Sequence, residues 1–395
     1  MLCDEKGRRR ALQLLAGAVL APIGVGRAAD SVGPPLRIGV SLSLSGAYAN
    51  NGDMQHKAYQ LWMAQVNRRG GLLGRPVELL VRDDRSSPDA ARAIYEDLIQ
   101  HNRVDLLFSP FSSGITYAVA PIADRYGYPL LAAGAASDEI WKQGYRYIFA
   151  TIPPASRQTV GFLTLLADAG ISTLAIVSTP DVYAVTLVDG TRKWASEYGI
   201  RIVSTQGIAA GTPDLEPAAR IARESGASAL LMAGQFDESV RMTQALKRIG
   251  WRPAAFYASV GPTLDKFGDE LAGDADRVLA TSTWEPRSEL PFAGSADFIR
   301  QFNSRFNQQP SFLAAQAYAA GQLLEEALKR VGRLDRRLLR DTLASLDCNV
   351  IIGRYTVDQA GMLTRRPPLI IQWQRGRREI VWPPEVRTSI ARLGL

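Results

Sequence analysis

The sequence contains few of the side chains on which most enzymes and metal sites depend. Its 395 residues include only two histidines, His56 and His101, and two cysteines, Cys3 and Cys348. Both histidines stand in polar segments with helical spacing, where surface positions are expected. The sequence has no Cys/His cluster of the zinc-binding type, no G-x-S-x-G, no Walker loop and no dinucleotide-binding glycine motif. We therefore predict that the chain is not an enzyme, has no catalytic residues, and binds no metal or cofactor.

The apolar run at residues 14–25 is too short to span a bilayer, which takes about 20 residues. It follows three arginines at positions 8–10, and this order of a charged and an apolar region is typical of an export signal. Cleavage after Ala28 would leave Gly26 and Ala28 at the small-residue positions, so the predicted signal comprises residues 1–28. Twin-arginine export and Sec export both fit these residues. We expect an exported chain without stable membrane insertion.

Positive charge is in modest excess, with a formal net charge of +7. Residues 1–28 contribute five basic and two acidic side chains, so +4 remains when this segment is removed. The other arginines are scattered, with mild clusters at residues 330–340 and 375–378, which we interpret as solvated helix faces. We therefore predict no nucleic-acid partner.

The two cysteines do not indicate a disulfide. Cys3 lies in the segment predicted to be removed, and it precedes the apolar run instead of ending it, so it is not placed as a lipid anchor. Cys348 is then the only cysteine left, and we expect it to be a small buried apolar residue.

A strand, a loop and a helix follow one another near the start of the predicted mature chain. Residues 36–44 are apolar and read as a buried parallel strand, residues 45–53 are small and polar, and apolar side chains then recur at helical spacing over residues 58–66. In an open α/β sheet such a loop lies at the carboxyl end of its strand, where ligands bind. We place the binding site here, with Tyr48 and Asn51 at its edge, although Tyr48 fits packing between lobes equally well.

Strands and helical segments alternate along the rest of the chain. Strands are expected at residues 76–82, 104–108, 129–132 and 147–152, and after residue 156 again at residues 173–177, 200–206, 229–232 and 254–257. This alternation predicts right-handed βαβ crossovers and parallel sheets. Two copies of the pattern predict an α/β protein with two doubly wound lobes and a hinge. Near the end, residues 355–361 and 369–373 alternate like a hairpin.

Two further loops of the first copy supply candidate ligand-binding residues. Ser112 and Ser113 precede a helix and can offer hydroxyl and backbone N–H groups to a carboxylate at the positive end of the helix dipole. Ser112 can cap the helix while Ser113 reaches the ligand. Ala135 and Ala136 belong to the next loop, and their small side chains let a ligand approach the main chain closely.

The same residues resemble a known family. The succession IGVSLSLSGAYANNGD, then a helix, then NRRGGLLGRPVELLVRDD is similar to the start of the type I periplasmic solute-binding proteins of the leucine/isoleucine/valine-binding kind. In that family a strand ends in Ser-Gly, a Gly-Asp pair begins the helix, and a later strand ends in aspartates. The match extends in order from about Leu36 to Trp382 and Pro383.

The resemblance implies an architecture and a function. It implies two lobes joined by a three-segment hinge, with residues 36–152 and 284–346 in lobe 1 and residues 153–283 and 347–395 in lobe 2. It also implies a periplasmic receptor that closes over a small organic ligand and delivers it to the permease and ATPase subunits of an ABC importer. We expect such a receptor to be a monomer.

The resemblance further implies ligand-binding residues in lobe 2. They are Tyr183, the residue at position 235 or 236, for which we choose Phe236, and Val260. Amino-acid binders of the family have an acidic residue where this chain has Val260, and usually a hydroxyl residue where it has Ala136. Because a buried ammonium without a counter-charge costs several kcal/mol, we expect a carboxylate or another ligand without an α-amino group.

Two alternatives stay open. A shift of the correspondence by one or a few residues would let Asp237, Glu238 or Asp265 supply the acid, and would then admit an amino acid. Independently, the same fold could serve as a ligand-sensing module that passes its closed state to a separate receptor or regulator.

Overall fold

The computed structural model describes residues 33–287, 290–363 and 367–394. The predicted export signal and Cys3 lie outside the described residues. In these three ranges, no helix combines the length and the apolar character of a membrane-spanning segment.

The first sheet is built around the strand that opens the described chain. β1 (Leu36–Leu42) lies between β2 (Val77–Asp83) and β3 (Leu106–Leu107), and both neighbours run parallel to it. β4 (Leu130–Ala132) and β5 (Ile148–Ala150) form a separate parallel pair. All four large apolar side chains of β1 are fully buried, as expected for a parallel strand that is covered on both faces.

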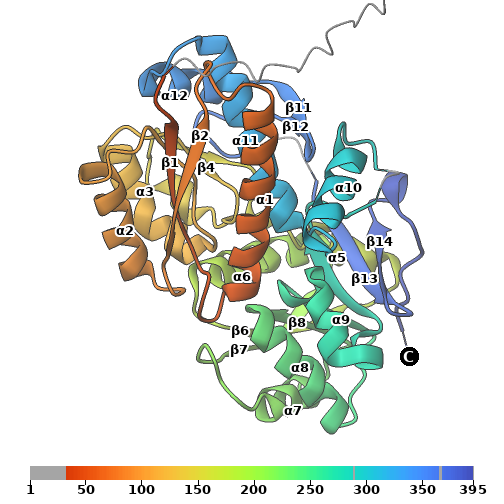
Figure 1. The fold of residues 1–395 in the computed structure, drawn as a ribbon. Helices are drawn as coiled ribbons and strands as arrows, with labels where there is room; N and C mark the ends of the chain where they lie inside the picture. Colours follow the sequence, from red (N-terminus) through yellow and green to blue (C-terminus); the bar gives the residue numbers. More distant parts are fainter. Residues whose placement is uncertain (1–32, 288–289, 364–366, 395) are drawn as a thin grey trace, which may run out of the picture. The chain divides into compact units, whose positions relative to one another are not determined.

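Helices from distant parts of the sequence cover this sheet. They are α1 (Ala49–Arg68), α2 (Pro88–Gln100), α3 (Ser113–Arg125), α4 (Glu139–Lys142), α10 (Ser295–Phe306), α11 (Phe312–Val331) and α12 (Arg336–Ser345). α1 and α11 lie side by side (Figure 1), and Trp62 Nε1 donates to Glu325 Oε1 between them at 2.7 Å. Gly321 permits this approach, because a Cβ there would lie 2.5 Å from the Trp62 ring. One hydrophobic core therefore joins these segments.

The second sheet has the strand order β14-β13-β10-β9-β8-β6-β7. Its strands are β6 (Thr173–Ser178), β7 (Arg201–Gly207), β8 (Ala229–Ala233), β9 (Ala255–Ala258), β10 (Val278–Ser282), β13 (Leu369–Gln374) and β14 (Arg377–Trp382). The strands from β7 to β10 are parallel, and β13 and β14 add an antiparallel edge.

Helices lie on both faces of the second sheet. α5 (Val160–Asp168) and α6 (Val182–Glu197) pack on one face, and α7 (Glu216–Glu224), α8 (Phe236–Arg248) and α9 (Asp265–Leu271) pack on the other. Each face has its own hydrophobic core. The predicted α/β class with two doubly wound, mainly parallel sheets is therefore confirmed.

Within the described residues, the chain passes from the first sheet to the second after β5 and returns after β10; later, Leu363 packs in the first core and Leu369 begins β13 of the second sheet. β11 (Cys348–Val350) and β12 (Gly353–Tyr355) precede the last crossing and form a short antiparallel pair. The apolar side chains of residues 346–363 pack in the first core, although their predicted place is lobe 2. Cys348 is only partly buried, because β11 lies at the rim of that core.

The predicted hairpin between residues 355–361 and 369–373 is wrong. β13 pairs with β14 instead, through the two-residue connection Arg375-Gly376. The φ angles of these two residues are +53° and +76°. Positive φ at both residues of a two-residue connection gives a twist that matches antiparallel strands.

The two arginine clusters have different structures. Residues 330–340 comprise the end of α11, the connection after it and the first half of α12. Most of their arginines lie on the surface as predicted, but the Arg340 side chain is only 15% exposed and lies over the Tyr147 ring. Residues 375–378 form the turn and the start of β14, and the Arg378 side chain is buried. The interpretation of this second cluster as a solvated helix face is therefore wrong.

Candidate ligand-binding cleft

A small cavity lies between the two sheets, beside the crossing segments. Its volume is about 50 Å³. Side chains reach it from the loops after β3, β4, β8 and β9, from the crossing segments, and from the starts of α6 and α11. The lining residues are Phe111, Ser112, Ser113, Gly134, Ala136, Ile152, Gln158, Tyr183, Gln235, Ser259, Val260, Thr281, Thr283, Phe312 and Leu313. The cavity thus lies at the carboxyl ends of parallel strands, where ligands bind in open α/β sheets.

The first sheet contributes the start of α3. The Ser112 Oγ accepts a hydrogen bond from the Ile115 N–H at 3.1 Å, so Ser112 is the N-cap, as predicted. The Ser113 Oγ accepts from the N–H groups of Ala136 and Ser137 at 3.0 Å each. Because both of these bonds are accepted, the Ser113 hydroxyl proton remains available as a donor. The end of α3 that faces the cavity also carries the positive end of the helix dipole.

The second sheet contributes Tyr183 and Val260. Asp181 caps α6, and its Oδ1 accepts from the N–H groups of Tyr183 and Ala184 at 3.1 Å. The Tyr183 hydroxyl donates to Gln158 Oε1 at 2.8 Å. Burial raises the pKa of Tyr183 well above its usual value, so the side chain is neutral. Val260 lies at the end of the loop after β9.

Four of the nine predicted ligand-binding residues do not line the cavity: Tyr48, Asn51, Ala135 and Phe236. The Tyr48 ring makes an edge contact with Phe111 at 5.5 Å between ring centroids. Burial, Asp181 and Glu238 raise the pKa of Tyr48 to about 12.

Asn51, Ala135 and Phe236 are each buried elsewhere. Phe236 is the first residue of α8 and packs in the core on that face of the second sheet, whereas the N-cap residue Gln235 faces the cavity. Gln235 and not Phe236 therefore lines the cavity, because the direction in which the helix begins decides which side chain points inward.

Several lining residues were not selected from the sequence because they lie in the crossing segments. Thr281 Oγ1 donates to the Gln158 carbonyl at 2.6 Å, and the Tyr257 hydroxyl donates to Thr281 Oγ1 at 2.9 Å. On the other side, Gln316 Nε2 donates to Thr283 Oγ1 at 2.9 Å. These polar side chains are held in place by partners far away in the sequence, and only the loop and helix-start positions carried a sequence signal.

The cavity lining contains no charged residue. The three acids considered as alternatives are engaged elsewhere: Glu238 accepts from the N–H groups of Gly211 and Gln235, Asp237 lies near Arg241, and Asp265 pairs with Arg378. Asp181 lies beside the cavity and binds backbone N–H groups, and burial raises its pKa although these hydrogen bonds oppose the shift. Within the described part of the chain, the cavity therefore has no carboxylate in its wall to face a ligand ammonium.

Hydroxyl groups from the two sides of the cavity are in contact. The Ser137 hydroxyl, in the loop after β4, lies 2.6 Å from the Thr186 hydroxyl on α6 and donates to the Val182 carbonyl at 3.1 Å. A cavity needs about 10 to 15 Å³ for one water molecule, so the present volume accepts only a few waters.

The chain belongs to the periplasmic binding protein family. The family model for periplasmic binding proteins matches residues 35–377. Members of this family are solute-binding proteins.

Individual relatives agree with this assignment. The Leu/Ile/Val-binding protein homolog 7 of Brucella melitensis is 24% identical over 377 residues, which cover 91% of this chain and 94% of the relative. The branched-chain amino acid transporter substrate-binding protein LivJ of Streptococcus pneumoniae, solved with isoleucine, superimposes with a TM-score of 0.81 at 22% identity, over 88% of this chain and 100% of that one. A solute-binding protein of an R. palustris ABC transporter, solved with benzoate, superimposes with a TM-score of 0.77 at 19% identity, over 91% of this chain and 97% of that one.

Proposed function

We propose that the protein is an exported, periplasmic receptor that closes over a small organic solute and delivers it to the permease and ATPase subunits of an ABC importer. Membership of the periplasmic binding protein family supports the receptor role. Relatives described as substrate-binding or solute-binding proteins of transporters support delivery to an importer. Such a receptor performs no reaction on its ligand.

The ligand class follows from one observation, the uncharged wall of the cavity. An α-amino acid would bury its ammonium without a carboxylate partner, which costs several kcal/mol. A carboxylate, in contrast, can bind the Ser113 hydroxyl and the N-terminal end of α3. Phe111, Tyr183 and Phe312 offer aromatic surface for an apolar body. We therefore assign a carboxylate or another solute without an α-amino group, a class that the benzoate complex of the R. palustris relative also represents.

Closure of two lobes is the proposed mechanism. A ligand that touches Ser113 on one side and Tyr183 on the other binds the closed form better, and so shifts the population toward it. We propose that lobe 1 comprises residues 36–152 and the segment from residue 284, and that lobe 2 comprises residues 153–283 and the tail. The packing of residues 346–363 with the first core favours a last crossing after residue 363 rather than near 346.

A panel of matched ligands tests the ligand class. Leucine, its des-amino analogue 4-methylpentanoate, benzoate and benzamide are compared by thermal shift and calorimetry, because a ligand that binds the folded state stabilises it by mass action. We expect the carboxylates without an amine to bind and leucine to bind at least about tenfold more weakly. Tight leucine binding with no binding of 4-methylpentanoate would contradict the assignment.

Two variants test the site itself. Ser113→Ala removes a hydrogen bond to a charged group, so we expect affinity to fall by about tenfold or more. Tyr183→Ala removes aromatic contact from the opposite side and should weaken binding similarly. Ser345→Ala, at an exposed position of α12, is the control. Unchanged affinity in both cleft variants would mean that the ligand binds elsewhere.

A further inference from the structure

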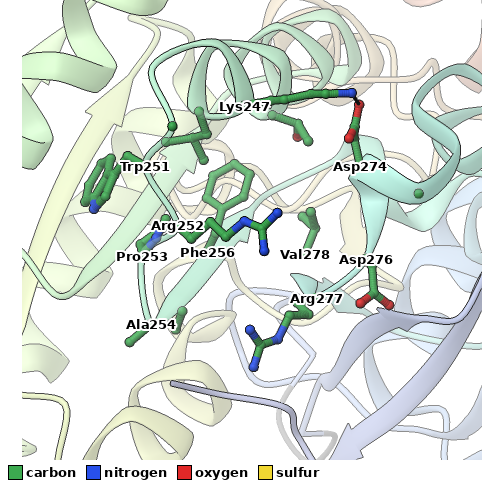
Figure 2. A pocket seen from close by; sticks show the side chains of 15 residues that line it. Lys247, Trp251, Arg252, Pro253, Ala254, Phe256, Asp274, Asp276, Arg277 and Val278 are labelled. Atoms are coloured by element: carbon green, nitrogen blue, oxygen red, sulfur yellow. Dashed lines mark hydrogen bonds and ion pairs between the residues drawn. The ribbon is translucent and has the colours of Figure 1, made fainter. Parts of the chain in front are cut away.

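A second pocket lies at the opposite end of β9 from the cleft. The cleft residues Ser259 and Val260 follow this strand, whereas the second pocket is formed where β9 and β10 begin. Its walls come from the end of α8, from residues 250–254 and from residues 273–278 (Figure 2). Its volume is about 330 Å³, which lies within the range of small-molecule sites, about 300 to 1,000 Å³.

Two arginines in this pocket have no acidic partner. Arg252 is exposed, and the described residues provide it with no ion pair or side-chain hydrogen bond. Figure 2 shows its guanidinium in the middle of the pocket, beside Phe256 and Val278. Arg277 is held in position by its main-chain N–H, which donates to the Trp373 carbonyl at 2.7 Å. Its side-chain Nε is buried and has no hydrogen-bond partner in the described part of the chain.

The acids of the same pocket are already paired. Asp274 accepts from Lys247 Nζ at 2.7 Å. Asp276 accepts from the Arg375 N–H at 2.9 Å and from Arg392 Nη1 at 3.1 Å. The positive charges of Arg252 and Arg277 are therefore not balanced within the pocket. A buried donor such as the Arg277 Nε is normally satisfied by a partner, and an anion would provide one.

Part of the wall is apolar and aromatic. Leu246, Trp251, Phe256 and Val278 line the pocket together with the arginines. Arginine recognises carboxylate and phosphate groups through its planar set of donors, and aromatic rings give an apolar body a large contact surface. This combination differs from the cleft, whose lining has no charged side chain.

We propose that this pocket is a second ligand site, which binds a small organic anion. The carboxylate or phosphate group of the anion lies against Arg252 and Arg277, and its apolar body packs against Trp251 and Phe256. The site is separate from the cleft, because the two lie at opposite ends of β9.

The full chain labelled with 5-fluorotryptophan tests this proposal, with the Trp251 resonance assigned by Trp251→Phe. The probes are phenyl phosphate, benzoate, inorganic phosphate and benzyl alcohol. We expect phenyl phosphate or benzoate to shift the Trp251 resonance saturably. Whichever of the two binds more tightly shows whether the site prefers a phosphate or a carboxylate. Inorganic phosphate should bind more weakly because it lacks the apolar body, and benzyl alcohol should have no effect because it lacks the charge.

Variants decide whether the arginines carry the binding. Arg252→Gln with Arg277→Gln should weaken binding by about tenfold or more, since each lost contact is a hydrogen bond to a charged group. Arg201→Gln removes the same charge from an exposed position on β7 of the same sheet and should leave the affinity unchanged. If the double variant fails to fold, Arg252→Gln alone serves, because Arg252 is exposed. The proposal is overturned if none of the anions shifts the Trp251 resonance saturably with a dissociation constant below about 1 mM. It is also overturned if the arginine variant binds the anion as tightly as the wild-type protein.

Discussion

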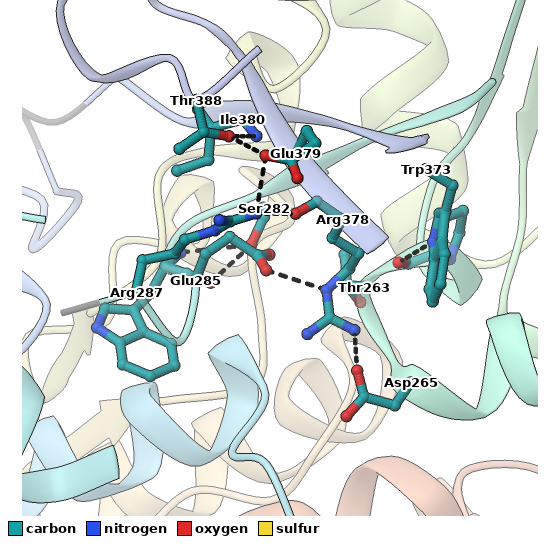
Figure 3. Close-up of polar contacts among 12 residues, drawn as sticks. Thr263, Asp265, Ser282, Glu285, Arg287, Trp373, Arg378, Glu379, Ile380 and Thr388 are labelled. Carbon is teal, nitrogen blue, oxygen red and sulfur yellow. Dashed lines mark hydrogen bonds and ion pairs between the residues drawn. The ribbon is translucent and has the colours of Figure 1, made fainter. Parts of the chain in front are cut away.

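The Nε of Arg378 lies 3.0 Å from the Glu285 carboxylate, and the two side chains are only 7% and 3% exposed (Figure 3). The pair joins β14 to the segment that follows β10 and crosses between the two sheets. Asp265 contacts the same guanidinium from the start of α9. Beside this pair, Arg287 Nη2 donates to Glu379 Oε2 at 2.9 Å. Charged groups therefore hold one crossing segment to the edge of the second sheet.

Loss of one partner of this buried pair should destabilise the protein. In Glu285→Gln the Arg378 charge stays buried with Asp265 as its remaining partner, so we expect the free energy of unfolding to fall by about 3 kcal/mol, the lower end for breaking a buried pair. Asp189→Asn is the matched control, since the Arg192–Asp189 pair is about half exposed and should contribute less than about 1 kcal/mol. Denaturant unfolding measures both. Equal effects of the two substitutions would contradict the assigned role of Glu285.

A methyl group at Gly52 should be poorly tolerated. Gly52 belongs to the Gly-Asp pair at the start of α1, and a Cβ there would lie 2.1 Å from the Ser43 carbonyl oxygen. Gly52→Ala must shift either the helix or the loop, so we expect a loss of about 1 to 3 kcal/mol. Gly114 lies in α3 with no atom within 4 Å of an added Cβ, and Gly114→Ala should instead stabilise by about 0.5 to 1 kcal/mol. Thermal unfolding compares the two, and a neutral Gly52→Ala would show that the loop adapts freely.

The contact between Ser137 and Thr186 should contribute to closure over the ligand. Thr186→Val removes a hydroxyl that lies 2.6 Å from the Ser137 hydroxyl across the cleft. One hydrogen bond contributes about 1 kcal/mol, so we expect the affinity of the best cleft ligand to fall by about fivefold. Thr164→Val removes a hydroxyl that bonds only within α5, to the Val160 carbonyl, and is the control. Calorimetry that finds the two variants equal would exclude a role of this contact in closure.

His56 should make stability depend on pH. Burial lowers the pKa of His56 below its usual value near 6.5, with Lys57 acting in the same direction and Asp53 opposing. The Gln60 amide nitrogen lies 3.1 Å from His56 Nε2 and can donate to it only while that nitrogen is unprotonated. The unfolded chain takes up a proton at a higher pH than the folded chain, so the contribution is present above about pH 6.5 and is lost as the pH falls through the lower folded pKa.

Urea unfolding at about pH 7.5 and about pH 5.5 measures this contribution on either side of the usual pKa. His56→Gln should lose less stability between the two values than the wild-type protein. His101→Gln controls for the loss of a histidine as such. An unchanged pH dependence in His56→Gln would show that the ring does not contribute.

Local signals in the sequence located most elements well. The predicted strand at residues 36–44 is β1, which ends two residues earlier, and the Ser87 hydroxyl caps α2 by accepting from the Ala90 N–H. Asp83 and Asp84 accept from the N–H groups of Arg85 and Ser86, two residues along the chain, but they also bind Ser43, Leu44 and Ser45, 38 to 41 residues away. The strand and the helix cap depend on residues only a few positions apart, so the sequence itself records them.

The sequence indicates less well which strands pair and which charged side chains are buried. The β13–β14 pairing depends on a turn at Arg375-Gly376, and the burial of Arg378 depends on Glu285, 93 residues away. In the same way, Gln158 and Thr281 reach the cleft through contacts between crossing segments.

The sequence by itself determined the alternation of strands and helices, the two copies of that pattern, and the helix start at Ser113, while the family resemblance pointed to Tyr183 and Val260. Only the tertiary structure decided that these three side chains line one cavity, that Gln235 rather than Phe236 faces it, and that Arg252 and Arg277 share a pocket at the other end of β9. The reason is physical. Backbone propensity and capping act over a few residues, whereas burial and charge pairing depend on which distant segments the fold brings into contact.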